Sequence, residues 1–211
     1  MLSEIFKLFW KTVERKDARR INSQTPPTEI EQFCDIQYID DGLWQHRLDV
    51  YSKSGKLSHR PVIIDIHGGG WMYGTKEINK NYCLVLAQND YVVVNINYRL
   101  APDFSVADQL RDCFFAFKWV STNIEKYGGD LNNVFVTGDS AGGFLAAYSA
   151  LLNSSEKLRK IFGVTESGLE FRACGLTSPV CFMNTHTFQD VYYSRVKGKE
   201  FSESTLRGFE N

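Results

Sequence analysis

The segment VFVTGDSAGGFLAA, residues 134–147, joins a short apolar run to a glycine-bearing bend and an alanine-rich stretch. Residues 133–137 predict a short strand, residues 138–143 a tight turn, and residues from about 141 to 152 a helix. A strand, a turn and a helix in immediate succession are typical of α/β proteins with a parallel sheet. This segment therefore favours the α/β class.

Two other segments support the same architecture. Residues 62–66 (VIIDI) and 91–96 (YVVVNI) are nearly continuous β-branched runs, which indicate strands covered on both faces. Helices are expected over residues 75–88 and 105–127, and a further strand over 171–178. The alternation predicts a doubly wound, mostly parallel sheet, in which ligands bind at the carboxyl ends of the strands.

The N-terminal region has a different pattern. Residues 1–20 carry apolar side chains at steps of three and four, which predicts an amphipathic helix, and a linker with two prolines follows to residue 28. Packing of the helix on its own protein is favoured over a membrane-surface role, which stays open. Residues 35–39 and 48–52 predict an antiparallel hairpin at the sheet edge.

Composition excludes several classes of function. The 211 residues have a formal charge of -1, so no broad electrostatic field would attract nucleic acid. Charges interrupt the apolar N-terminus, which argues against a secretion signal or stable membrane insertion and favours a cytoplasmic protein. The five scattered cysteines fit reduced thiols, with no disulfide framework and no metal site. No cofactor is implied.

The bend GDSAG, residues 138–142, matches the pattern G-x-S-x-G in the context that its chemistry requires. A serine hydroxyl is a weak nucleophile unless it is held exposed on a tight turn beside a base. The helix that follows adds a positive dipole end where negative charge develops. Ser140 is therefore the candidate nucleophile, although a glycine-rich turn without chemistry is the alternative for this motif taken alone.

A second glycine-rich segment, HGGGW at residues 67–71, follows the strand predicted over 62–66. Consecutive glycines allow backbone N–H groups to point at a ligand oxygen, and acyl transfer needs two or three such donors around its oxyanion. Because the two strands are expected to be neighbours, the two bends should face each other.

With HGGGW, YRLAP at residues 98–102 and GDSAGG at 138–143 in this order, the chain resembles the hormone-sensitive-lipase-like carboxylesterases of the α/β-hydrolase fold. The resemblance implies a serine carboxylesterase with a small-molecule ester substrate and no metal. It implies that Ser140 is the nucleophile. It also implies an oxyanion hole formed by the backbone N–H groups of Gly69, Gly70 and Ala141. The residues that support these two loops would be His67, Gly68 and Asp139.

The resemblance also predicts a division of the chain. Residues 1–28 would be a cap helix and linker, 29–182 an incomplete core with about six of the usual eight strands, and 183–211 a partial cap segment that ends in a helix over 202–210. The strand over 171–178 would then be an exposed edge.

The catalytic acid and histidine are the missing part of the pattern. In this fold the acid follows the serine and the histidine follows the acid. Here His186 is the only histidine after Ser140, and Asp190 comes after it, which reverses the expected order. Surface polar residues are the favoured interpretation of this pair, and His46 and His59 are poorer candidates. The chain is then a fragment, a half completed by a C-terminal partner chain, or an inactive ligand-binding relative; a homo-oligomer also stays open.

Overall fold

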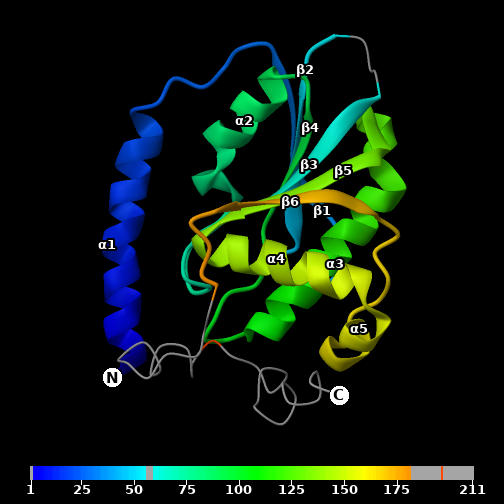
Figure 1. The fold of residues 1–211 in the computed structure, drawn as a ribbon. Helices are drawn as coiled ribbons and strands as arrows, with labels where there is room; N and C mark the ends of the chain where they lie inside the picture. The colour runs from blue at the N-terminus through cyan, green and yellow to red at the C-terminus, as the bar shows by residue number, and fades with distance from the viewer. Residues whose placement is uncertain (1, 56–58, 182–195, 197–211) are drawn as a thin grey trace.

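A computed structural model describes residues 2–55, 59–181 and 196. The strands form one sheet in the order β1-β2-β4-β3-β5-β6 (Figure 1). Their bounds are Ile30–Gln37 for β1, Arg47–Lys53 for β2, Arg60–Ile66 for β3, Val92–Ile96 for β4, Gly129–Asp139 for β5 and Phe171–Thr177 for β6. The predicted α/β architecture is confirmed.

Strand direction divides the sheet into two parts. β1 and β2 pair antiparallel, and β2 is antiparallel to β4, whereas β4, β3, β5 and β6 run parallel. The predicted hairpin is confirmed, but its first strand begins at Ile30 rather than at residue 35. Asp35 adopts a φ of +58° within an irregular register between Phe33 and Ile36, which explains why the alternating pattern was misplaced there.

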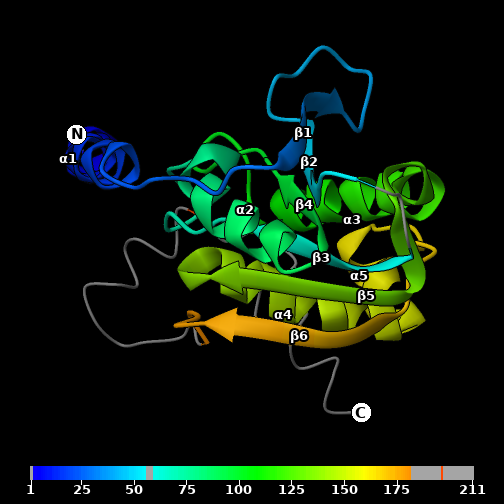
Figure 2. The ribbon, with the colours of Figure 1, turned by 90° about the horizontal axis from the view of Figure 1, so that it is seen from above.

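Helices cover both faces of the sheet, as a doubly wound fold requires (Figure 2). The helix α2 (Lys80–Gln88) packs on β2 and β4, and α3 (Val106–Asn123) and α4 (Ser140–Ser154) lie together on the other face. A separate apolar cluster forms on each side: Tyr51, Cys83, Leu84, Ala87 and Val93 lie on the α2 side, and the larger cluster lies on the α3 and α4 side. Burial on both faces accounts for the β-branched runs in β3 and β4.

The helix boundaries differ from the predicted ones at three places. The helix expected over residues 75–88 is interrupted, because the 3₁₀ turn η1 (Lys76–Ile78) precedes α2. The helix α3 begins at a capping box between Ser105 and Asp108, and the 3₁₀ turn η2 (Ile124–Tyr127) follows it. The short helix α5 (Glu156–Phe162) was not predicted.

The N-terminal helix α1 (Leu2–Asn22) stands beside the α2 side of the sheet (Figures 1 and 2). Trp10 stacks on Tyr73 at a centroid distance of 5.4 Å. However, Leu8 and Phe9 are 68% and 57% exposed, so this packing covers the apolar stripe only in part. None of the described helices has the length and apolarity that crossing a membrane would require.

The strand β6 is the last strand of the described sheet, and most of its residues are exposed. Its only partner among the described strands is β5. This agrees with the exposed edge that the sequence predicted. The helix expected over 202–210 and the segment 183–211, apart from the buried Val196, lie outside the described residues.

Candidate active site

The two glycine-rich bends meet because β3 and β5 are adjacent and end together. In their parallel register Ile66 pairs with Gly138, so the residues after each strand leave the sheet at the same edge. The approach is close: a methyl group added at Gly142 would lie 2.0 Å from the carbonyl oxygen of Ile66. A methyl group added at Gly138 would lie 2.4 Å from the carbonyl oxygen of Gly142. Only glycine fits both positions.

Ser140 lies at the top of the tight turn between β5 and α4. Its φ of +51° falls in the left-handed region, which is strained for a residue with a side chain. It is the first residue of α4, and the residue is partly exposed. The next residue, Ala141, belongs to the first helical turn, whose N–H groups have no acceptor within the helix.

Asp139 joins the two bends. Its Oδ1 atom accepts a hydrogen bond from the backbone N–H of Gly68 at 2.9 Å. Gly68 has no room for a side chain, because an added methyl group would lie 2.4 Å from Asp139 Oδ2. The carboxylate thus contacts the loop that carries the predicted oxyanion donors.

Asn79, which the sequence analysis did not consider, completes this contact. Its Nδ2 atom lies 2.9 Å from Asp139 Oδ1 and 2.9 Å from Oδ2 of Asp65. Asp65 is 1% exposed, and burial raises the pKa of its carboxyl to about 7. A charged residue inside the β-branched run of β3 was the one signal in the sequence that could have directed attention here.

His67 is a buried support of the loop. Its ring stacks on Tyr98 at 4.3 Å, and its Nδ1 atom lies 2.7 Å from the carbonyl oxygen of Gly68. The hydroxyl of Tyr98 donates to the carbonyl oxygen of His67 at 2.7 Å. Burial lowers the pKa of His67 to about 4, so the imidazole is neutral at pH 7. Such an imidazole holds the backbone and carries no charge.

The glycines after His67 turn the backbone around. Gly69 and Gly70 have φ values of +120° and +57°, and the carbonyl oxygen of Gly69 accepts from the N–H groups of Met72 and Tyr73. The carbonyl oxygen of Trp71 accepts from the N–H of Ala101 at 2.8 Å and from Nε2 of Gln109 at 2.9 Å. The loop is therefore fixed at both ends.

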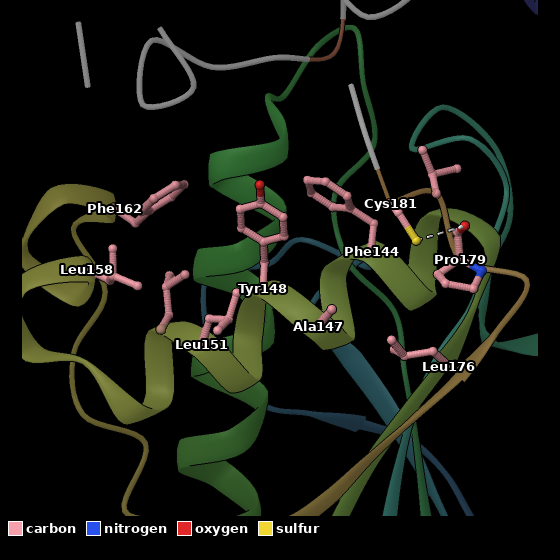
Figure 3. Close-up of a pocket in the computed structure, with 11 residues that line it drawn as sticks. Phe144, Ala147, Tyr148, Leu151, Leu158, Phe162, Leu176, Pro179 and Cys181 are labelled. Carbon is pink, nitrogen blue, oxygen red and sulfur yellow. Dashed lines mark hydrogen bonds between the residues drawn. The ribbon is translucent and has the colours of Figure 1, made fainter. Parts of the chain in front are cut away.

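An apolar pocket of about 430 Å³ runs along α4 from the serine turn toward α5 (Figure 3). The N–H of Val180 donates to the carbonyl oxygen of Ser140 at 3.1 Å, which places one wall of the pocket next to the turn. The side chains in Figure 3 come from α4, α5, the end of β6 and the chain after it, and include Phe144, Tyr148, Leu158, Phe162, Leu176 and Pro179.

The family model BD-FAE matches residues 48–185, which span both bends and most of the sheet. The chain belongs to this family. Its solved structural neighbours have the α/β-hydrolase fold, which confirms the predicted resemblance. Esterase B from Lactobacillus rhamnosis superposes with a TM-score of 0.90 at 31% identity, over 100% of this chain and 68% of that one.

Curated relatives of this BD-FAE chain include a deacetylase and an esterase. It is 46% identical over 130 residues to arylacetamide deacetylase from Oryctolagus cuniculus, covering 59% of this chain and 32% of the relative. It is 36% identical over 112 residues to versiconal hemiacetal acetate esterase from Dothistroma septosporum, covering 53% of this chain and 33% of the relative. The matched segments thus span about a third of the length of these two relatives.

Two of the described histidines of this family member have partners other than Ser140. Among residues 2–55, 59–181 and 196, no histidine forms a hydrogen bond with Ser140. His67 is held by Tyr98, and His46 lies between Asp41 and Asp112, at 2.7 Å and 3.2 Å. The segment with His186 and Asp190 lies outside the described residues.

Metal chemistry finds no support in the same part of the chain. Within the described ranges, no three His, Cys, Asp or Glu side chains gather in an arrangement that could hold a metal ion. The five cysteines are unpaired thiols, and burial raises the pKa of Cys113 above its usual range.

Proposed function

We propose that the chain is a carboxylic ester hydrolase, or the larger part of one, in which Ser140 forms an acyl-enzyme. The observation that carries this proposal is the strained left-handed conformation of Ser140 directly opposite the glycine loop of β3. Strain at such a turn is characteristic of a nucleophile held out from the sheet. The esterase relatives support the same reaction class.

The reaction would proceed by nucleophilic acyl transfer. Ser140 Oγ attacks the ester carbonyl, its proton passes to a base, and the negative charge moves to the carbonyl oxygen. The N–H groups of Gly69, Gly70 and Ala141 would stabilise that oxyanion. Each such donor typically lowers the activation barrier by about 3 to 4 kcal/mol. Collapse releases the alcohol, and water then hydrolyses the acyl-enzyme.

The base must come from residues other than the described ones. Either His186 acts in this role, or a polypeptide that completes the sheet at β6 supplies a histidine and an acid. The exposed edge of β6 supports the second route, because it leaves surface that a further strand would bury. The pocket also supports a substrate with a hydrocarbon group next to the ester.

Covalent labelling by a fluorophosphonate probe tests the nucleophile. Wild-type chain should be phosphonylated, and Ser140→Ala should not be, whereas Ser154→Ala at the other end of α4 should label like wild type. Absence of labelling in the wild type, with or without an added base, would instead favour a ligand-binding protein that does not catalyse ester hydrolysis.

Imidazole in solution separates the two sources of the base. If the chain has no base of its own, added imidazole should accelerate labelling of Ser140, and His186→Ala should label as slowly as wild type. If His186 is the base, the His186→Ala substitution should slow labelling and imidazole should restore it only in that variant.

A further inference from the structure

Asn79 occupies a fixed position behind the two bends. It lies between η1 and α2, where its backbone N–H donates to the carbonyl oxygen of Lys76 at 3.2 Å and its own carbonyl accepts from Cys83 at 2.9 Å. Its side chain makes no capping hydrogen bond to α2. The side-chain amide therefore does not cap the helix and can contact other groups.

Both N–H groups of that amide donate hydrogen bonds to aspartate side chains. Nδ2 of Asn79 donates to Oδ2 of Asp65 and to Oδ1 of Asp139, each at 2.9 Å. A primary amide has two N–H donors, so these contacts satisfy the nitrogen completely and fix which way the amide points. Asp65 is buried within β3, which makes it the anchor of the arrangement.

Asp139 lies next to space into which its side chain could turn. It is partly exposed, and a small cavity of about 100 Å³ lies beside it, lined by Asp65, Asn79, Tyr82, Thr137, Gly138, Asp139 and Thr177. A carboxylate next to such a space could turn away from the glycine loop and be hydrated instead. The hydrogen bond from Asn79 to Oδ1, the same atom that accepts from Gly68 N–H, opposes that rotation.

We propose that Asn79 is a positioning residue: its amide, anchored on Asp65, holds the Asp139 carboxylate against Gly68 and so sets where the N–H groups of Gly69 and Gly70 lie relative to Ser140. The catalytic consequence rests on the proposed function. The structural part, that Asn79 keeps Asp139 hydrogen-bonded to Gly68 N–H, is independent of the proposed function.

Three variants test the proposal in the 211-residue chain. Asn79→Ala removes the donor, and Asn79→Asp replaces it by a third carboxylate between Asp65 and Asp139. Asn81→Ala is the matched control, because the Asn81 amide lies two residues further on and donates to Gln24 Oε1 at 2.8 Å near α1. The two readouts are hydrogen–deuterium exchange at the Gly68 amide and the maximal rate of Ser140 phosphonylation at saturating probe.

Asn79→Ala should accelerate exchange at Gly68 by about tenfold and slow phosphonylation by roughly 10- to 100-fold, because one hydrogen bond is lost and the donors shift. Asn79→Asp should be worse than Asn79→Ala in both readouts. The order distinguishes positioning from helix capping, since Asp caps a helix as well as Asn does and Ala does not. Asn81→Ala should match wild type.

An Asn79→Asp variant equal to wild type, or unchanged Gly68 exchange in Asn79→Ala, would overturn the proposal. If the wild type is not phosphonylated at all, the proposed function fails, and exchange at Gly68 still decides whether Asn79 holds the loop. If exchange rises but phosphonylation does not slow, Asn79 holds the loop without positioning the oxyanion donors, and the proposal is wrong.

Discussion

The two bends that form the candidate site are held in different ways. The bend after β5 depends on close backbone contact: neither Gly138 nor Gly142 has room for even a methyl group. The bend after β3 is held mainly by side chains from later in the chain, namely Asp139, Tyr98 and Gln109. The comparison teaches that the serine turn is fixed by close backbone packing, its own and that of β3, whereas the glycine loop depends on side chains 31 to 71 positions away.

This difference predicts how each bend responds to substitution. Replacing a glycine of the serine turn by a larger residue should overpack the turn and greatly lower the free energy of unfolding. A change in the supports of the glycine loop should cost less stability and act mainly on the geometry of the N–H groups that we propose as oxyanion donors.

The largest effect is expected for Gly142→Ala. The new methyl group would lie 2.0 Å from the carbonyl oxygen of Ile66, and backbone cannot move aside as a flexible side chain can. We expect a loss of about 3 kcal/mol in the free energy of unfolding, measured by urea denaturation. Gly175→Ala is the control, because its methyl group would meet only the Thr137 hydroxyl at 3.1 Å. Equal losses in the two variants would contradict the close-contact explanation.

Gly69→Ala should have the second-largest effect, a loss of roughly 2 kcal/mol. Two causes combine here, a φ of +120° and a methyl position 2.0 Å from the carbonyl oxygen of Tyr73. Gly42→Ala separates them, since Gly42 has a φ of +78° with no atom within 4 Å of the added methyl group. If Gly42→Ala destabilises the chain as much, backbone strain alone explains the loss and the loop is less tightly packed than the structure indicates.

The third prediction concerns pH. Burial lowers the pKa of His67 from 6.5 to about 4, so this residue contributes stability above pH 6.5 that is lost as pH falls toward 4. Burial raises the pKa of Asp65 from 3.8 to about 7, so its contribution is present below pH 4 and is lost as pH rises toward 7. The two slopes oppose each other.

Each slope can reach about 1.4 kcal/mol per pH unit. In the wild type the two dependences should largely cancel between pH 4 and 6.5, so His67→Gln should leave stability falling as pH rises there, and Asp65→Asn should leave it rising. Urea denaturation at several pH values measures both. A pair of variants whose pH profiles run parallel to the wild type would show that neither group has a shifted pKa.

The smallest effect is expected for Tyr98→Phe, which deletes the hydrogen bond from the tyrosine hydroxyl to the carbonyl oxygen of His67. The loss should be about 1 kcal/mol in the free energy of unfolding. Tyr38→Phe is matched, because the Tyr38 hydroxyl donates to a buried carbonyl, that of Asn97, at 2.8 Å. Both should lose similar stability, but only Tyr98→Phe should slow phosphonylation of Ser140. If phosphonylation slowed in both variants, the effect could not be assigned to the side chains that hold the loop after β3.

The sequence predicted the elements more reliably than their ends. Continuous β-branched runs identified β3 and β4, because burial on both faces selects such residues along the whole strand. Hydrophobic periodicity merged η1 and α2 into one helix, and it did not reveal α5. These boundaries depend on caps, as at Ser155, whose hydroxyl accepts from Leu158 N–H, and such contacts leave little trace in apolar spacing.

By itself the sequence determined the serine turn, since its glycines and Ser140 all lie within residues 138–142 and their spacing is a steric requirement of one strand meeting one helix. It also determined which loop should face that turn, through the order of the parallel strands. Only the tertiary structure revealed Asn79 and Asp65, because the contacts that join them to Asp139 connect three elements. No local pattern encodes such contacts; they exist only once β3, α2 and β5 have packed together.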